Sequence, residues 1–365
     1  MNFILNILFF IISITSLVAQ NNQRNPLDYE SILSGTFGEL RTNHFHSGVD
    51  IKTKGKEGSK IYAFSEGYVS RIKISKGGYG KAIYIKHSDG KTTVYAHLKS
   101  FSKKIEKIVK TKQYLKENYE IEIFPGFNEI KISNNELIAF SGNTGGSSGP
   151  HLHFEIRDIN QKPLNPLNYG IDVQDNRAPS ILGLKIYSLY KNMEIKNSKN
   201  LTFYKKDKNS YITDTIQSIG ALGFGVQTID RQDLASNKNG VYKINTYIDN
   251  DTLISIDFNK FSFEETKHIN RYIDYPEFKR NKKRFQKLFI QKNNPLSIYK
   301  KEKNQGVVSL NENSRYLITI EVIDFNQNIT KLFIPIKGTL ETDILNNDNK
   351  IKIGDFNKSF INRNK

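Results

Sequence analysis

The sequence HLHFE at residues 151–155 alternates polar and apolar side chains, and this pattern decides what kind of domain carries it. Alternation with a period of two is typical of a β-strand, in which successive side chains point to opposite faces. His151 and His153 would therefore share one face, about 7 Å apart along the chain. One of them could bind a metal ion while the other faces the cavity beside it.

The same alternation recurs between glycine-containing turns from Gly35 to about Arg157. It is clearest in KIYAFSEGYVSRIKI (60–74), KAIYIKH (81–87) and TTVYAHL (92–98). Short alternating segments bounded by Gly, Asp and Ser predict a mainly antiparallel sheet. We therefore expect the N-terminal half to form a mainly β domain.

The alternation is interrupted between residues 101 and 135, and we interpret this segment as an insertion. Apolar residues in SKKIEKIVKTKQYLKENY (102–119) follow helical spacing, and EIEIFPGFNEIKI (120–132) predicts two strands about a Pro-Gly turn. We expect this partly helical insertion to stand beside the functional site, as one wall of a cleft. An added element there could also cover the cleft and hold an enzyme latent.

A second candidate ligand pair lies in HSGVD, which contains His46 and Asp50. Four fully extended residues span about 13 Å, too far for two ligands of one metal ion. Gly48 allows a bend, and Gly, Val and Thr nearby disfavour a helix, so we place the pair on a tight turn that enters a strand.

Six of the seven histidines in the chain lie between residues 44 and 153, which concentrates the chemistry in the N-terminal half. Three candidate ligands and two spare imidazoles suit metal-assisted hydrolysis, because two histidines and a carboxylate leave a position for water. Fe(II) could bind the same set, although nothing in the sequence suggests an oxygenase. The candidate site residues are His46, Asp50, His97, His151 and His153.

Four motifs together resemble the lysostaphin and LytM type of zinc peptidoglycan endopeptidase. They are HSGVD (46–50), GGYG (77–80), YAHL (95–98) and SGNTGGSSGPHLHFE (141–155), and the resemblance covers roughly residues 35–166. It implies a small antiparallel β-sheet domain of the duplicated hybrid motif type. It also implies that peptidoglycan peptides are the substrate.

Carried over residue by residue, the resemblance makes His46, Asp50 and His153 the ligands of one Zn²⁺ ion. His97 and His151 become the catalytic pair. As a hypothesis, zinc polarises the scissile carbonyl and activates water while the two imidazoles accept its proton and stabilise the oxyanion. Neither the choice of base nor the peptidoglycan bond that is cut follows from the sequence.

Other polar residues near the motifs have weaker claims to a role. Glu155 shares the strand face of HLHFE and could orient a ligand, although a structural carboxylate is the favoured interpretation. His44 and His87 are expected to be structural or exposed, and His268 is isolated in the second half. The glycine-rich stretch at 141–150 lacks the ending of a phosphate loop and is expected to present His151.

A second domain follows a boundary rich in Pro and Asn. Strand-like segments at irregular spacing predict a β-sandwich, interrupted by a helical or disordered interlude at about 264–291. The expected divisions are a signal peptide at 1–19, a polar lead-in at 20–34, the metallopeptidase domain at 35–166, a linker at 167–179, a β-sandwich-like domain at 180–340 and a polar tail at 341–365.

Composition limits the remaining function classes. The uncharged apolar stretch at 3–17 is too short for a membrane span and favours a cleaved leader, with an uncleaved anchor as the alternative. We therefore expect export to the periplasm or cell envelope, without a stable span once the leader is cleaved. The absence of cysteine excludes disulfides, thiolate ligands and a cysteine nucleophile. A net charge of +17 suits a polyanionic wall or reflects a solvated surface, and no nucleic-acid motif accompanies it.

The sequence leaves one rival function open. A non-catalytic or latent member of the same family could regulate a cell-wall amidase or act as an envelope scaffold. Such members typically lose metal ligands, and the intact set here favours the enzyme. Protein partners, oligomeric state and the ligand of the second domain cannot be deduced from the sequence.

Overall fold

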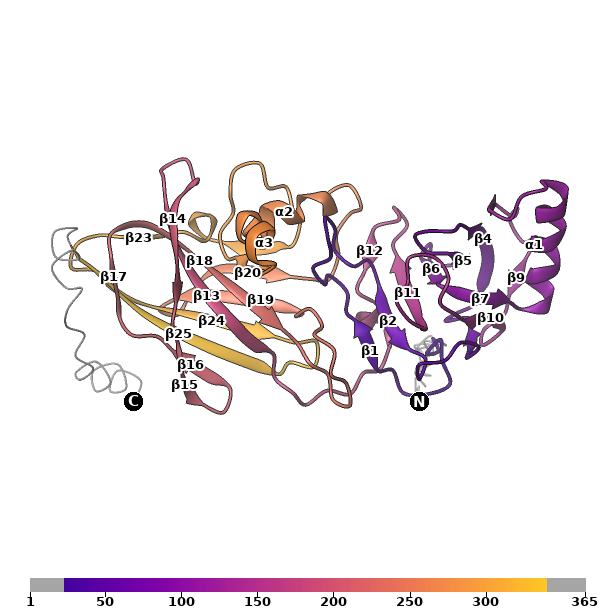
Figure 1. Ribbon diagram of the computed structural model, residues 1–365, viewed down its shortest axis with the longest axis horizontal. Helices are drawn as coiled ribbons and strands as arrows, with labels where there is room; N and C mark the ends of the chain where they lie inside the picture. Colours follow the sequence, from indigo (N-terminus) through magenta and orange to yellow (C-terminus); the bar gives the residue numbers. More distant parts are fainter. Residues whose placement is uncertain (1–22, 340–365) are drawn as a thin grey trace, which may run out of the picture.

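The computed structural model describes residues 23–339, which form two domains placed end to end along the long axis (Figure 1). The expected leader at 1–19 and the polar tail at 341–365 lie outside the described residues. Within the described part of the chain, no helix is long and apolar enough to cross a membrane.

The first domain is built on a large antiparallel sheet, the class of sheet that the alternating sequence predicts. HLHFE begins the central strand β11, where His153 lies directly opposite Asp50 on the neighbouring strand. From one edge to the other, the strands are β1 (Leu33–Gly35), β2 (Val49–Lys52), β11 (His151–Arg157), β6 (Thr92–Ala96), β5 (Lys81–Lys86), β4 (Gly67–Ile74) and β8 (Ile121–Ile123), with β12 (Pro163–Leu164) beside β11 and β9 (Lys131–Ile132) beside β4.

One face of this sheet is covered and the other is open. The cover is a small sheet of β3 (Lys60–Tyr62), β10 (Leu137–Ser141) and β7 (Leu98–Phe101). Between the two sheets lies the first hydrophobic core, which takes Leu152 and Phe154 from β11. Because side chains alternate along β11, His151 and His153 point to the open face.

The first domain begins earlier than the sequence predicts. Leu27 and Leu33, inside the expected lead-in at 20–34, are 2% and 1% exposed and belong to the first core. The strand β1 starts at Leu33 and pairs with β2. The polar residues around these two leucines conceal their burial in the sequence.

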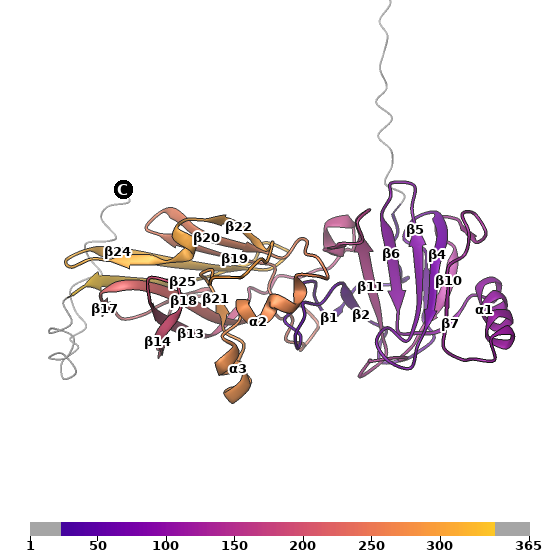
Figure 2. The same ribbon diagram turned by 90° about the horizontal axis from the view of Figure 1, so that it is seen from above.

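The insertion contains the predicted helix, α1 (Lys103–Leu115), which buries Ile105 and Val109 in the first core. Its two strands, β8 and β9, both pair with β4. The expectation that the insertion stands beside the functional site is wrong, because β8 lies four strand positions from β11, about 19 Å at about 4.8 Å per strand. Figure 2 shows α1 beyond β7 and β10, at the end away from the second domain.

The second domain is the predicted β-sandwich. The sequence identified six of its strands and missed the others, including those in the polar segment 195–218. One sheet contains β14 (Ile195–Leu201), β13 (Ser180–Leu189), β18 (Gly220–Ile229), β21 (Gln286–Lys287) and β23 (Val308–Leu310). The other contains β15 (Tyr204–Asp207), β16 (Ser210–Ile212), β17 (Ile216–Ser218), β25 (Ile329–Gly338), β24 (Arg315–Ile323), β19 (Lys243–Ile248), β20 (Asp251–Asp257) and β22 (Tyr299–Glu302).

Short helices connect the strands, and most of them occupy the predicted interlude. Lys185, on β13, is buried beneath α3, where it pairs with Asp274 and Glu277 at 2.9 Å each. These pairs fasten the interlude to the sandwich. The helices are η1 (Pro166–Tyr169), η2 (Thr266–His268), α2 (Ile269–Tyr272), α3 (Tyr275–Asn281) and η3 (Asn304–Gly306).

The two domains share a hydrophobic core through residues 36–47, here called the docked loop, which connects β1 to β2. Its Phe37 stacks on Phe261 with ring centroids 4.9 Å apart, and its Phe45 lies 5.9 Å from Phe258. Both loop residues belong to the core of the second domain. The backbone N–H of Phe45 also donates to Thr266 Oγ1 at 2.7 Å.

Gly38 tests how closely the docked loop fits the second domain. Its φ is +74°, and a Cβ atom there would meet Phe258 at 2.7 Å. Gly170 has φ +87° with no atom within 4 Å, so Gly170→Ala should cost only the left-handed strain, about 1–2 kcal/mol. Gly38→Ala should cost clearly more, measured as the loss of unfolding free energy in urea. Equal losses would mean that the loop is not tightly packed.

Candidate metal centre and active site

The three predicted ligands come together on the open face of the large sheet. His46 Nε2 lies 3.0 Å from Asp50 Oδ1 and 3.1 Å from His153 Nδ1, and the last two atoms are 2.9 Å apart. Donor atoms that share one zinc ion are expected about 3–4 Å apart, because each bond is about 2.0–2.2 Å long. The three residues, hereafter the ligand group, can therefore reach one ion.

Two features of the backbone bring the ligand group together. The β2–β11 register sets His153 opposite Asp50, so that both side chains leave the same face of the sheet. His46 ends the docked loop, two residues before Gly48. A Cβ at Gly48 would lie 2.3 Å from the carbonyl oxygen of Phe154, so only glycine lets the chain turn this close to β11.

Outward hydrogen bonds fix the tautomers of both histidine ligands. His46 Nδ1 donates to the carbonyl oxygen of Thr36 at 2.8 Å, and His153 Nε2 donates to Glu155 Oε1 at 2.8 Å. Carbonyl and carboxylate oxygens only accept, so each ring proton lies on the outer nitrogen and each inner nitrogen presents a lone pair. Two lone pairs and a carboxylate oxygen thus converge on one point.

Glu155 contacts the ligand group directly, which makes it more than the structural carboxylate that the sequence favours. Its other oxygen accepts from Arg157 Nε at 2.6 Å, and Ser47 Oγ donates to Oε1 at 2.6 Å. Burial would raise the pKa of Glu155, but Arg157 and His153 hold it well below its usual range. A permanently ionised Glu155 keeps the proton on the outer nitrogen of His153.

Tyr79 is a member of the site to which the sequence assigned no role. Its hydroxyl contacts Glu155 and lies 3.1 Å from Ser47 Oγ, and its ring lies 5.1 Å from that of His153. Only its place in GGYG could have drawn attention to it. The tyrosine closes one side of the ligand group.

His97 and His151 lie beside the ligand group with their ring centroids 4.8 Å apart. His97 Nδ1 donates to Thr144 O and His151 Nδ1 donates to Gly149 O, each at 2.8 Å. Both Nε2 atoms are left with lone pairs, and that of His151 is 3.5 Å from Asp50 Oδ1. Burial and the neighbouring imidazoles lower the pKa of His97 to about 4, which keeps it neutral near pH 7.

The two glycine-rich stretches pack against each other and position these imidazoles. Gly146 N donates to Gly78 O at 2.7 Å, and a Cβ at Gly145 would meet Gly80 N at 2.3 Å. The contact holds Thr144 where its carbonyl oxygen receives the proton of His97. The stretch at 141–150 supports His97 and His151 in this way, as a turn leading into β11.

The other histidines stay outside the cluster. His87 donates from Nδ1 to Glu66 O at 2.6 Å on another part of the sheet, and His44 is exposed. His268 lies in η2 of the second domain. This distribution agrees with the structural or exposed roles predicted for His44 and His87.

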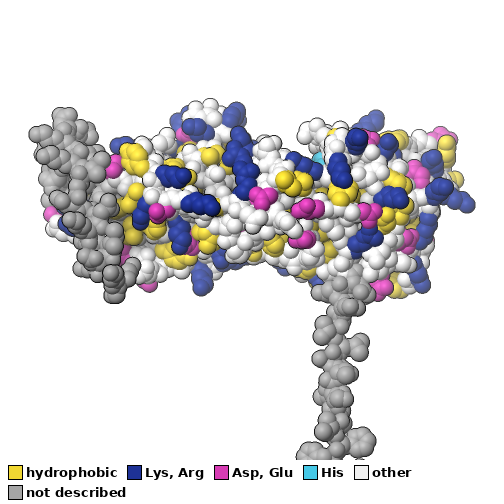
Figure 3. Space-filling view, turned by 90° about the horizontal axis from the view of Figure 1, so that it is seen from below, with side chains coloured by type: hydrophobic (Ala, Val, Ile, Leu, Met, Phe, Trp, Pro, Cys, Tyr) yellow, Lys and Arg dark blue, Asp and Glu magenta, His cyan; other side chains and the backbone are white. Residues whose placement is uncertain are grey.

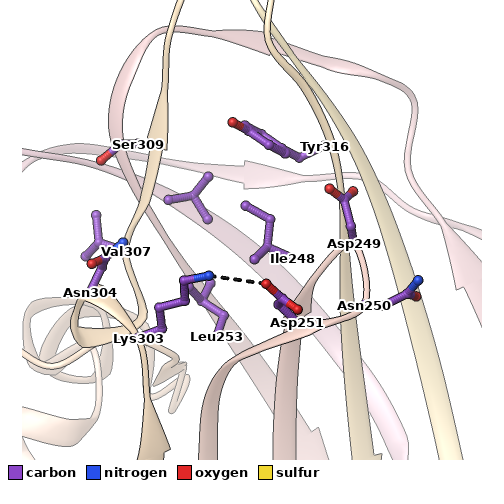
Figure 4. A pocket seen from close by; sticks show the side chains of 11 residues that line it. Ile248, Asp249, Asn250, Asp251, Leu253, Lys303, Asn304, Val307, Ser309 and Tyr316 are labelled. Atoms are coloured by element: carbon purple, nitrogen blue, oxygen red, sulfur yellow. Dashed lines mark hydrogen bonds and ion pairs between the residues drawn. The ribbon is translucent and has the colours of Figure 1, made fainter.

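A separate hollow lies in the second domain, near the turn between β19 and β20 (Figure 4). Lys303 Nζ and Asp251 Oδ2 pair across it at 3.2 Å. Its lining contains Ile248, Leu253 and Tyr316 but no histidine. The histidine chemistry therefore belongs to the first domain.

Comparison with known proteins places this domain in a family. Residues 44–117 match Peptidase family M23, and the matched segment includes His46, Asp50 and His97. Sequence relatives and the motifs agree with this match, so the first domain belongs to the M23 peptidase family of the lysostaphin and LytM type. The second domain is an additional β region outside the match.

Two curated relatives and one solved structure illustrate the similarity. The DD-carboxypeptidase/endopeptidase Mpg of Neisseria meningitidis is 34% identical over 151 residues, 40% of this chain and 28% of that protein. The murein hydrolase activator NlpD of Salmonella dublin is 34% identical over 124 residues, 34% of this chain and 26% of that protein. The lysostaphin catalytic domain of Staphylococcus simulans is 20% identical with a TM-score of 0.28, over 38% of this chain and 91% of that one.

The chain thus matches less than a third of the length of these curated relatives.

The docked loop makes the ligand group depend on the second domain. Phe258→Ala removes the ring that packs on Phe45, so His46 should be held less firmly and zinc affinity should fall about tenfold or more. Phe224→Ala is the matched control, because Phe224 is equally buried in the same core and lies on β18. Both variants should lose about 3–5 kcal/mol of stability.

Zinc affinity is measured by competition with a chromophoric chelator at a temperature where both variants remain folded. A similar loss of affinity in the two variants would show that general destabilisation, and not the loop contact, is responsible.

Proposed function

We propose that the protein is a zinc-dependent endopeptidase that hydrolyses peptide bonds in peptidoglycan stems or cross-links. One observation carries the proposal. His46 Nε2, His153 Nδ1 and Asp50 Oδ1 lie within 3.1 Å of one another, and the outer nitrogens of both rings donate their protons elsewhere. Three converging acceptors in a buried site are well suited to hold a cation between them.

The donor set fits zinc. Two imidazole nitrogens and one carboxylate are ligands that zinc accepts in catalytic sites, where three protein ligands leave a fourth position open. Asp50 Oδ2 accepts from Arg41 at 3.0 Å, which leaves Oδ1 directed at the ligand group. Fe(II) uses a similar set, but the surrounding residues offer no further support for an oxygenase.

Zinc held there would supply a Lewis acid and lower the pKa of a water molecule toward neutrality. The chain's own residues would handle the protons. His97 and His151 have their Nδ1 protons tied to backbone carbonyls, so each Nε2 can accept a proton and then donate it. As cations they would also stabilise negative charge that develops on the carbonyl oxygen of the scissile bond.

Peptidoglycan is proposed as the substrate because the related Mpg is a DD-carboxypeptidase/endopeptidase and NlpD activates a murein hydrolase. Export to the periplasm or envelope, where that polymer lies, is part of the same proposal. Figure 3 shows Lys and Arg side chains scattered over one face of both domains among acidic and neutral ones. This scatter favours a solvated surface over a single patch for binding the wall.

The rival function is regulation of a cell-wall amidase by a non-catalytic protein. The similarity to NlpD keeps this function in view. The intact ligand group and the two tethered imidazoles argue against it, because a regulator has no use for either.

Purified peptidoglycan digested with the zinc-loaded protein should give new peptide fragments, identified by mass spectrometry. Removing the metal with a chelator should abolish them, and added zinc should restore them, because no protein group replaces the Lewis acid. If no fragments appear with zinc present, while an amidase added to the same reaction is stimulated, the protein is a regulator.

Substitutions in the two classes of histidine should have different effects on hydrolysis and zinc content. His97→Ala should reduce hydrolysis about 10²-fold or more while zinc content stays near one ion per chain, since His97 lies outside the ligand group. His46→Ala should lose both activity and zinc. Metal content is measured by atomic absorption and hydrolysis by fragment release. Loss of zinc from His97→Ala would overturn the assignment of its role.

A further inference from the structure

A second group of metal-compatible residues lies where the linker joins the second domain. The linker after η1 is held between two loops, the segment 230–239 after β18 and the β24–β25 turn. Asn326 and Asn328 of that turn donate from Nδ2 to the carbonyl oxygens of Val173 and Asp175, each at 2.9 Å. From the other loop, the backbone N–H of Asp233 donates to Asp175 Oδ1 at 3.3 Å, so Asp175 lies against both loops.

Three carboxylates meet at this junction, one from each segment. Asp175, Asp230 and Asp324 each offer an oxygen, and the three oxygens lie within 4.8 Å of one another. Asp230 is 6% exposed and Asp324 is 1% exposed. Within the described part of the chain, no Lys or Arg nitrogen forms an ion pair with any of the three, although Arg177 acts on Asp230 from farther away.

Asn239 provides an independent indication that a ligand binds between these groups. It pairs with Asp230 in an antiparallel bridge, with reciprocal backbone hydrogen bonds of 2.9 and 2.8 Å, so both side chains leave the same face. Asn239 is 3% exposed and its Oδ1 has no hydrogen-bond partner. Oδ1 of Asp230 is likewise buried without a partner. Two neighbouring buried acceptors lack any donor.

We propose that Asp175, Asp230 and Asp324, with Asn239 Oδ1 beside them, bind one Ca²⁺ ion. Calcium takes 6–8 oxygen ligands at about 2.3–2.6 Å, so oxygens on opposite sides of the ion lie up to about 5 Å apart. The observed 4.8 Å limit fits within that distance. Carboxylate and amide oxygens are hard donors that suit calcium, whereas protein zinc sites usually include nitrogen or sulfur ligands, which this group lacks.

The proposed ion would tie the linker to both loops of the second domain. It would balance the negative charge of the ionised carboxylates, and it would give a ligand contact to the two oxygens that lack a hydrogen-bond partner. The site differs from the ligand group of the first domain in location and in donor chemistry. Its test can therefore be independent of peptidase activity.

The test uses the full, zinc-loaded chain in buffer freed of divalent cations with a chelating resin. Titration with CaCl₂ in a calorimeter should show one ion bound, with a Kd on the order of 10⁻⁵–10⁻³ M, and Tm should rise with Ca²⁺. MgCl₂ should give a much smaller response, because Mg²⁺ demands a stricter octahedral geometry. No heat and no Tm shift up to several times the weakest expected Kd would overturn the proposal.

Variants identify the ligands. Asp230→Asn and Asp324→Asn should each weaken Ca²⁺ binding at least tenfold. Their Tm without calcium should fall little, because the change also relieves repulsion. Asp233→Asn is the matched control: it removes the same charge from the same loop, where Asp233 Oδ2 accepts from Asn176 instead of joining the group. Equal weakening in Asp233→Asn would overturn the assignment.

A further variant separates this site from the zinc site. His46→Ala, which lacks one residue of the ligand group, should keep the calcium response of the wild type. If its calcium response disappears, Ca²⁺ binds at the first-domain cluster and the proposal fails. If the response persists while no peptidase activity is found in any variant, the calcium site stands and only the proposed hydrolysis fails.

Discussion

In the first domain, three hydrogen-bond acceptors converge at one buried site, one from each residue of the ligand group. The polar interior of the domain is arranged around this convergence. Imidazole and carboxylate groups removed from water lose solvation, and they can be held about 3 Å apart only if surrounding groups fix their orientation. The Glu155–Arg157 pair, the Thr36 carbonyl and the β2–β11 register all serve this end. Much of what is polar inside the domain is therefore arranged around one point.

The second domain takes part in that arrangement because the docked loop carries His46. Loops on a protein surface are usually mobile, and a ligand at the end of one would be poorly positioned. Here Phe37 and Phe45 belong to the core of the neighbouring sandwich, at roughly 1.5–3 kcal/mol of hydrophobic stabilisation for each buried ring. The sandwich thus acts as a support for the metal centre, a role that requires no ligand of its own.

The sequence was informative where chemistry depends on local spacing. HLHFE specified a strand and a shared face for His151 and His153, and the motifs named the five side chains that the structure brings together. The sequence did not indicate where these segments pack in the three-dimensional structure. The helical period of α1 is visible in the sequence, but nothing there says that β8 joins β4 at the far edge. Phe45 looks like any core residue of the first domain, and its burial in the second depends on contacts with residues more than 200 positions away.

The two domains are joined by the linker and by the packing of the docked loop, and each of these segments carries part of a residue group that could hold a cation. The docked loop ends at the ligand group of two histidines and Asp50. The linker carries Asp175 toward Asp230 and Asp324. Interfaces between domains within one chain are usually adjustable, and an ion bound between segments would make them less so. Because both groups join segments from different parts of the chain, an ion at each would restrain the domains at two separate points. That double restraint, together with the shared apolar core, would place His46 rigidly relative to β11.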